Sequence, residues 1–136
     1  MAQWVLEYYG TEKTQQHIAR ELHITTGDLE IVELLTYLRT QGLSVAPHQS
    51  DNDTASLLTL EKYVEEGLPV IVLQRRSLRS DEGHYRVVVG MNADRIVVLD
   101  PLVGLLYIPR EDFLLLWEAN TATVRSNQML AVKRAG

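Results

Sequence analysis

Apolar residues in the first half of the chain recur at the intervals of three and four that place side chains on one face of a helix. This pattern predicts helices over residues 1–9, 14–22 and 28–41, with Gly10 and Gly42 suited to end the first and the third. The first helix is expected to bury Met1, Val5 and either Tyr8 or Tyr9. The third helix is expected to bury Ile31, Leu34, Leu35 and Leu38.

A short strand and another helix are expected next. The segment LSVAPH, residues 43–48, predicts a strand, and the polar stretch QSDNDT after it predicts a loop. A helix is then predicted over residues 57–66, with Gly67 at its end. Thr14 and Asp28 are suited to cap the two preceding helices.

The second half of the chain changes to short β-branched segments separated by turn residues, which is typical of strands. The predicted strands cover residues 69–74, 84–91, 95–100, 105–108 and 128–134. Between the last two, Pro109 is suited to start a helix in which Phe113 and Trp117 face the sheet together. Helices followed by a mostly antiparallel sheet predict an α+β domain with its helices packed on that sheet.

The composition is that of a globular protein of one domain. Of 136 residues, 46% are hydrophobic and 23% are charged, and this length can bury a substantial core. The net charge is −5, and basic residues are scattered except in RRSLRS at 75–80, so we expect no nucleic-acid partner. The longest apolar runs, LPVIVL and FLLLW, are shorter than the roughly 20 residues that cross a bilayer.

The chain contains no cysteine. It therefore has no thiol nucleophile, no disulfide and no thiolate metal site, and its composition suits a reducing compartment. The start, MAQWVLEYYG, lacks the positive segment and small-residue cleavage site of a signal peptide. These features together predict a cytoplasmic location.

The segment GHYRVVVGMNADRIVVLDP, residues 83–101, predicts a hairpin with His84 and Asp100 at its open end. If residues 92–94 form a three-residue turn, Arg86 lies opposite Asp100 and His84 is the diagonal neighbour of Asp100. Diagonal neighbours have Cα atoms roughly 7–8 Å apart, which a hydrogen bond between imidazole and carboxylate can bridge. A two-residue or four-residue turn would place the two side chains on opposite faces unless a bulge intervened.

A bonded histidine and aspartate have a defined use in catalysis. The carboxylate fixes the tautomer of the ring, and the other ring nitrogen is then free to accept a proton from a nucleophile. The alternative is structural: His84 ends a strand with its nitrogens bound to backbone, and Asp100 starts a turn before Pro101.

Other polar residues are candidates for metal binding or peptide binding. His17, His23 and His48 lack the spacing of metal ligands, so we expect surface positions for them and no metal or cofactor. The segment QRRSLRSDEG, residues 74–83, is predicted to be a loop at the same sheet end as His84. There, Arg75 and Arg76 are candidates to bind carboxylates of an acidic peptide. The alternative is a solvated loop whose charges balance one another.

The order and spacing of these segments resemble the double-glycine-leader, bacteriocin-processing cysteine peptidases, a branch of the papain-like superfamily. The resemblance covers nearly the whole chain, and its parts are VLEYYG, TQQHIARELHI, GDLEIVELLTYLRTQGLSV, LEKYVEEGLPVIVL, GHYRVVVGMNADRIVVLDPLVG and IPREDFLLLW. It implies a papain-like fold in which His84 is the general base and Asp100 orients it.

The chain departs from that family at the nucleophile. In the family, a Cys-Gly-Pro segment begins the helix that ends in YYG, and a glutamine before it helps to form the oxyanion hole; neither is present here. Residues 1–136 are therefore expected to form a single peptidase-like domain that lacks the start of the catalytic helix, and to be inactive as written.

Three functions are compatible with this pattern. The first is binding of a peptide or leader segment without cleavage, for a transporter or maturation complex. The second is an N-terminally truncated form of an active leader-processing peptidase. The third is a structural or oligomerisation domain, and an exposed apolar edge at the shortened helix would then favour a homodimer.

Overall fold

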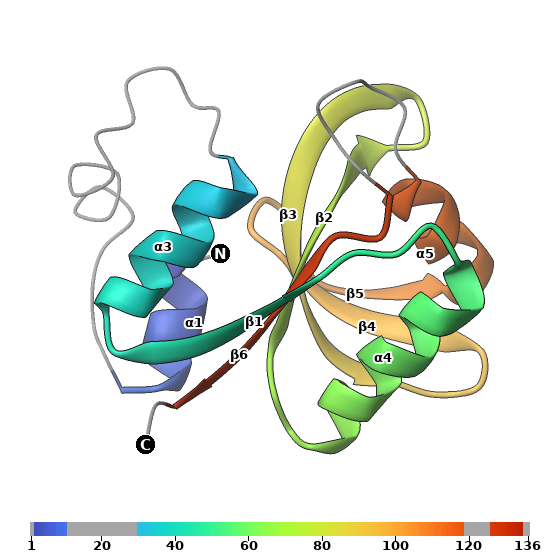
Figure 1. Ribbon diagram of the computed structural model, residues 1–136. Coiled ribbons are helices and arrows are strands. Elements are labelled where there is room, and N and C mark those ends of the chain that lie inside the picture. Colours follow the sequence, from blue (N-terminus) through green and yellow to red (C-terminus); the bar gives the residue numbers. More distant parts are fainter. Residues whose placement is uncertain (1, 11–29, 119–125, 135–136) are drawn as a thin grey trace.

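The computed structural model describes residues 2–10, 30–118 and 126–134. These residues form a six-stranded antiparallel sheet with helices on both sides (Figure 1). Helices α1 (Ala2–Tyr8) and α3 (Ile31–Thr40) lie on one side, and α4 (Asp53–Glu65) and α5 (Arg110–Trp117) lie on the other. The α+β architecture predicted from the sequence is confirmed.

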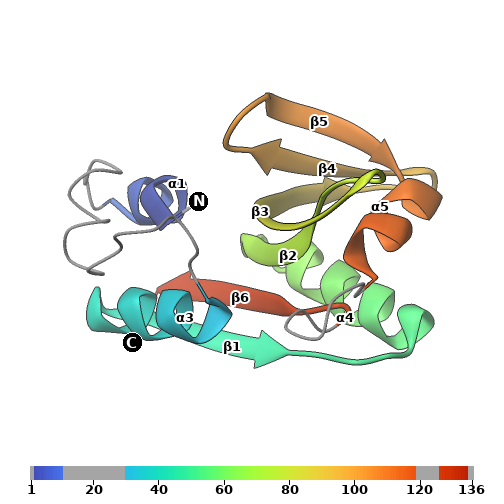
Figure 2. The ribbon, with the colours of Figure 1, turned by 90° about the horizontal axis from the view of Figure 1, so that it is seen from above.

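The strands follow the order β1-β6-β2-β3-β4-β5 across the sheet. Their bounds are β1 Leu43–His48, β2 Val70–Ser77, β3 Ser80–Met91, β4 Arg95–Asp100, β5 Gly104–Pro109 and β6 Met129–Arg134. Figure 2 shows that β3, β4 and β5 curve away from β1 and β6, with α5 beside the curved part. β1 and β5 are thus the outer strands of the sheet.

Two hydrophobic cores lie on opposite faces of the sheet. The first joins Val5 and Leu6 of α1 to α3 and the sheet, and the second contains Phe113 and Trp117 of α5. Successive side chains of a strand point to opposite faces, so Ile71 of β2 enters the first core while its neighbours enter the second. Burial on both faces explains the continuous apolar run VIVL in this strand.

The described helices agree with the apolar pattern at most positions. Leu34 and Leu38 of α3 are buried, and Ile31 and Leu35 pack at the edge of the same core. Tyr9, directly after α1, is the half-buried tyrosine of the predicted pair, with its hydroxyl donating to the Val132 carbonyl at 2.6 Å. The helix predicted over 14–22 and the predicted cap at Asp28 lie outside the described residues.

Helix α4 begins four residues before the predicted start at 57, so that boundary was wrong. The Asn52 side chain accepts a hydrogen bond from the Ala55 amide at 3.0 Å and caps the helix. The cap lies within the polar stretch that we interpreted as a loop. Its side-chain acceptor is the physical reason for the earlier start.

The loop predicted over residues 74–83 was also wrong. β2 continues to Ser77 and β3 begins at Ser80, so the segment is the end of a hairpin. The polar side chains at 76–79 are exposed where the strands extend beyond the cores, whereas Gln74 is buried and donates to the Phe113 carbonyl.

The prediction that Phe113 and Trp117 face the sheet together is confirmed, since both are buried in the second core with their ring centroids 5.1 Å apart. The Trp117 indole also donates to the Gln128 carbonyl at 3.0 Å, which ties α5 to the chain just before β6. In the part of the chain described, no helix combines the length and the apolar character that crossing a bilayer requires.

Candidate active site

The β3–β4 hairpin reaches the predicted register by a different route. The Asn92 amide donates to the Arg95 carbonyl at 3.0 Å, so the loop contains Ala93 and Asp94 alone and the predicted three-residue turn was wrong. Met91 faces Ile96 and Gly90 faces Val97, but beyond a bulge at Val89 the partners become Val88 and Val98. The bulge adds one residue to β3 and restores the parity that the shorter loop had reversed.

This register brings His84 and Asp100 together. Nε2 of His84 lies 3.0 Å from Oδ2 of Asp100, and their side chains are 13% and 3% exposed. The other carboxylate oxygen, Oδ1, accepts from the amides of Leu102 at 2.8 Å and Val103 at 3.3 Å. Asp100 is therefore held from the turn behind it as well as from β3.

A third side chain, Arg86, joins the pair, and the sequence analysis assigned it no role. Its Nε donates to Oδ2 of Asp100 at 2.9 Å, and its side chain is 5% exposed. One terminal nitrogen donates to Oε1 of Gln74 and to the Arg75 carbonyl, and the other donates to the Arg76 carbonyl. The predicted register already placed residue 86 opposite Asp100, and that was the signal that could have identified it.

The buried charges set the protonation of the pair. Burial lowers the pKa of His84, and the positive charge of Arg86 lowers it further, against the opposing effect of Asp100. Burial by itself raises the pKa of Asp100, but the Leu102 amide, His84 and Arg86 outweigh it and lower that pKa overall. The cluster therefore favours a neutral imidazole beside an ionised carboxylate.

The second ring nitrogen of His84 is available for chemistry. No group within residues 2–10, 30–118 or 126–134 forms a hydrogen bond to Nδ1. With Nε2–H donating to Asp100, the tautomer leaves a lone pair on Nδ1, so the ring can accept a proton from a nucleophile. In both Figure 1 and Figure 2, the N-terminal end of α1 is the end nearer to β3.

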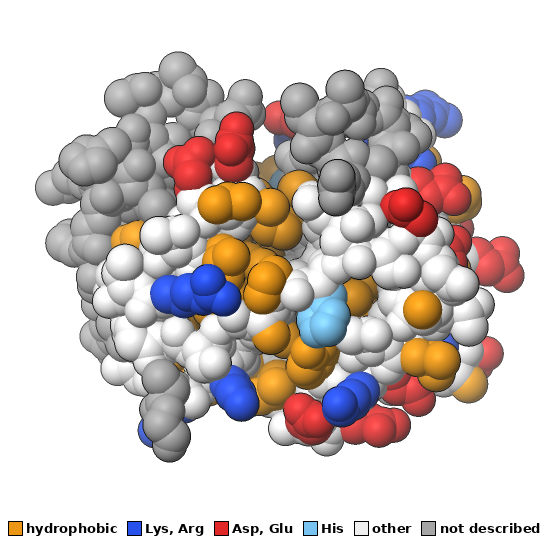
Figure 3. Space-filling model, viewed as in Figure 1, with side chains coloured by type: hydrophobic (Ala, Val, Ile, Leu, Met, Phe, Trp, Pro, Cys, Tyr) orange, Lys and Arg blue, Asp and Glu red, His pale blue; other side chains and the backbone are white. Residues whose placement is uncertain are grey.

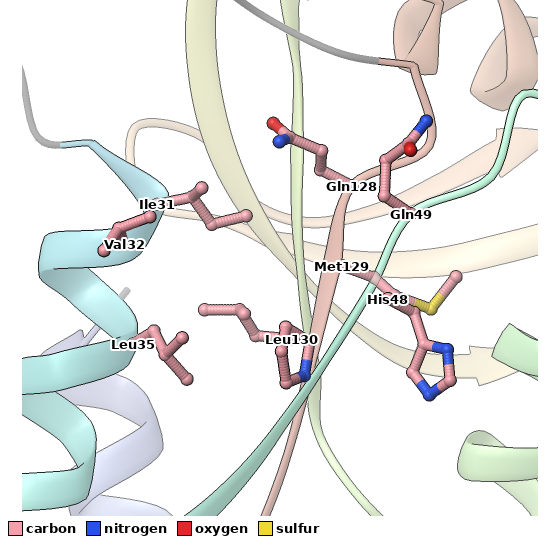
Figure 4. Close-up of a pocket in the computed structure, with 9 residues that line it drawn as sticks. Ile31, Val32, Leu35, His48, Gln49, Gln128, Met129 and Leu130 are labelled. Carbon is pink, nitrogen blue, oxygen red and sulfur yellow. The ribbon is translucent and has the colours of Figure 1, made fainter.

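An apolar groove of about 340 Å³ lies between α3 and the strands β1 and β6. Figure 3 shows hydrophobic side chains gathered in this hollow, and Figure 4 shows Ile31, Val32 and Leu35 along its α3 wall. The opposite wall and the end of the groove are formed by Pro47, His48, Gln49, Gln128, Met129 and Leu130. No pattern in the sequence predicts this groove.

One end of the groove lies near the His84 strand. The Leu73 amide of β2 donates to the Gln128 carbonyl at 3.3 Å, and Leu73 pairs with Tyr85 of β3. Adjacent strands are about 4.8 Å apart, so the Gln128 end of the groove is about 10 Å from β3 next to His84. His84 and Asp100 themselves do not line this groove.

The remaining candidate residues have contacts of their own. Arg75 donates to the carbonyls of Leu115 at 2.7 Å and Leu78 at 3.4 Å, which ties β2 to α5. Arg76 forms an exposed ion pair with Glu82 at 3.3 Å. Binding of a peptide by either arginine stays a prediction.

Of the three histidines outside the hairpin, the described residues include His48. His48 is exposed at the groove, with its Nε2 2.6 Å from the Tyr63 hydroxyl. His17 and His23 lie outside the described residues.

Comparison with known proteins adds a family and two similar structures. The profile of the peptidase C39 family matches residues 2–129, while no curated protein sequence matches the chain. The crystal structure of the peptidase domain of Streptococcus ComA, a bi-functional ABC transporter involved in a quorum-sensing pathway, superposes with a TM-score of 0.75. The two are 17% identical over 98% of this chain and 87% of that one.

A second crystal structure, the peptidase domain of Streptococcus mutans ComA, has a TM-score of 0.61 at 20% identity over 86% of this chain and 87% of that one. At this identity the two structures support the fold, and the family profile supports the relationship. The chain belongs to the peptidase C39 family, and its helices and antiparallel sheet form the papain-like fold of those peptidase domains.

Proposed function

We propose that this 136-residue chain binds a peptide, such as the leader segment of a precursor, without cleaving it. The observation that carries the proposal is a built His84–Asp100 pair near an open apolar groove, in a chain without cysteine. A neutral histidine can accept a proton, but attack on a peptide carbonyl also needs a nucleophile, and a thiol is missing from this sequence.

The groove suits a peptide with apolar side chains on one side. Its α3 wall is aliphatic, and Val32 is 63% exposed, so a ligand can still remove apolar surface from water there. Gln49 and Gln128 at one end carry amides that can bind a peptide backbone. That end lies about two strand spacings from the β3 backbone next to His84.

Fluorescence anisotropy with labelled amphipathic peptides that end in Gly-Gly tests the proposal. We expect saturable binding to this chain, weakened about tenfold by Val32→Lys because the substitution places a charge on the apolar wall. Leu58→Lys is the matched control, since Leu58 is 64% exposed on α4 and does not line the groove. Equal affinity for both variants, or no binding at all, would contradict the proposal, and the second result would favour a structural role.

An active peptidase is the second candidate. It is supported by Nδ1 of His84, to which no described residue forms a hydrogen bond, and by the N-terminal end of α1, which is the end nearer to β3. In that reaction a thiol would pass its proton to Nδ1, and its sulfur would bond to the scissile carbonyl carbon. The histidine would return the proton to the leaving amine as the C–N bond breaks, and water would hydrolyse the thioester.

A chain extended by a Cys-Gly-Pro segment ahead of α1 tests this second function. Release of the leader fragment by the extended chain, lost in its His84→Ala variant, would favour a peptidase. Binding without release would favour recognition alone. The unextended chain is the control in both assays.

We further propose a transporter or maturation complex as the partner, because the similar ComA peptidase domains belong to an ABC transporter. A homodimer is the other proposed assembly. It is supported by Val103, Leu105 and Tyr107, which expose more than half of their surface at the outer strand β5 and the turn before it. Sedimentation of the wild type and of Tyr107→Lys would detect a dimer formed through this strand.

A further inference from the structure

One carboxylate oxygen of Asp100 has two side-chain donors. His84 Nε2 lies 3.0 Å from Oδ2, and Arg86 Nε lies 2.9 Å from the same atom. Oδ1 is occupied by the amides of Leu102 and Val103. A carboxylate with both oxygens bound from fixed directions cannot rotate without breaking several of these bonds at once.

The Arg86 side chain, on β3, is itself held by hydrogen bonds to β2. Its terminal nitrogens donate to Gln74 Oε1 at 3.1 Å, to the Arg75 carbonyl at 3.0 Å and to the Arg76 carbonyl at 2.8 Å. Gln74 in turn donates to the Phe113 carbonyl of α5 at 3.1 Å. The planar guanidinium therefore connects β2, β4 and, through Gln74, α5, and a lysine could not reproduce this fork.

We propose that Arg86 is a positioning residue that fixes the Asp100 carboxylate so that it binds His84 through Nε2 and leaves Nδ1 as the free nitrogen. The use of that nitrogen in catalysis rests on the proposed peptidase-type function. The positioning role does not rest on that function, because it concerns atoms of this chain that are within hydrogen-bond distance of one another.

The charged groups near His84 make the effect measurable. Asp100 on β4 faces the ring directly, and Arg86 on β3 and Arg76 on β2 contribute positive charge. Asp100 favours the protonated ring, while both arginines oppose it. Loss of the Arg86 charge should thus raise the pKa of His84, while loss of its fork geometry should free the carboxylate to turn.

NMR of the full chain labelled with ¹⁵N at histidine tests the proposal, with Arg86→Gln and Arg86→Lys as variants. Arg95→Gln is the matched control, because Arg95 is an exposed arginine on the same hairpin. In the wild type at neutral pH we expect Nε2 to carry the proton and Nδ1 to be bare. Arg86→Gln should shift the His84 titration to higher pH and mix the tautomers, and Arg95→Gln should change neither.

The lysine variant separates charge from geometry. It should keep the low titration midpoint better than glutamine but still lose the single tautomer. A single Nε2–H tautomer in Arg86→Lys would overturn the positioning role, as would a protonated Nδ1 in the neutral wild-type ring. Arg86→Lys carries the test if Arg86→Gln fails to fold, and no readout depends on a peptide, so failure of the proposed function would be seen separately.

Discussion

The Asp100 cluster and the apolar groove are built in opposite ways. Asp100 and Arg86 are almost fully buried, and each is bound by several groups from neighbouring strands or turns. The groove is open, and its α3 wall presents aliphatic side chains such as Val32 to solvent. The first region is fixed by its own hydrogen bonds, whereas the second leaves apolar surface in contact with solvent.

This difference predicts which substitutions will change stability and which will change binding. A buried ion pair that loses one partner leaves a desolvated charge without compensation, which destabilises the fold. An exposed apolar residue contributes little to the fold, so its replacement changes binding more than stability. Stability and binding measured on the same variants therefore distinguish the two regions.

The largest effect is expected for Asp100→Ala. It leaves Arg86 buried without its carboxylate, so the free energy of unfolding should fall by about 3–5 kcal/mol. Urea denaturation followed by tryptophan fluorescence measures this change. Asp94→Ala, at an exposed loop position, is the control and should change stability by less than about 0.5 kcal/mol. A loss at Asp100 no larger than at Asp94 would remove the contrast between the two regions.

An intermediate effect is expected from pH. The pKa of His84 is below its ordinary value of 6.5 in the folded protein, so the unfolded chain binds a proton there that the folded chain does not. The free energy of unfolding should hence fall as the pH drops below 6.5, until the folded pKa is reached. Asp100 adds a further loss as the pH falls below its ordinary 3.8 and through its lowered folded pKa.

Denaturation curves between pH 8 and pH 5, which lie above the Asp100 range, isolate the histidine. His84→Gln should flatten the dependence in that range, and His48→Gln, at the exposed groove histidine, should leave it in place. The same slope in His84→Gln as in the wild type would show that another group is responsible.

The smallest effect is expected for Arg76→Ala. The pair between Arg76 and Glu82 is exposed at 53% and 62%, so its loss should change stability by less than about 0.5 kcal/mol. The same variant tests the predicted peptide role, because an acidic peptide bound there would lose affinity in anisotropy. Unchanged affinity would limit recognition to the groove.

The sequence was most informative where burial alternates or repeats. The boundaries of β1 and β4 were predicted correctly, because buried apolar side chains alternate with less buried ones along both strands. The approach of His84 to Asp100 was also anticipated, although the predicted turn was wrong and the bulge at Val89 compensated for it. The bulged residue is one of three consecutive valines, so the pattern of apolar residues could not reveal the bulge.

Polar and distant features were harder to predict. Arg86 lies in the middle of β3, between its polar first half and the apolar run VVV. Its burial depends on hydrogen bonds to carbonyls of β2, which the composition does not reveal. The groove joins residues near 31–35 to residues near 128–130, which meet only after the sheet has formed. Local sequence patterns carry little information about such long-range contacts. These contacts define most of the candidate site.

The bulge at Val89 separates the hairpin into two independently adjustable parts. Residues on the loop side of Val89 follow one pairing rule, while His84, Arg86 and Asp100 follow another. A deletion at the tip can accordingly be absorbed by losing the extra residue in β3, with the polar cluster left in place. A hairpin shorter by this one residue would therefore keep the position of the histidine, so such a deletion would not by itself indicate that the chemistry is lost.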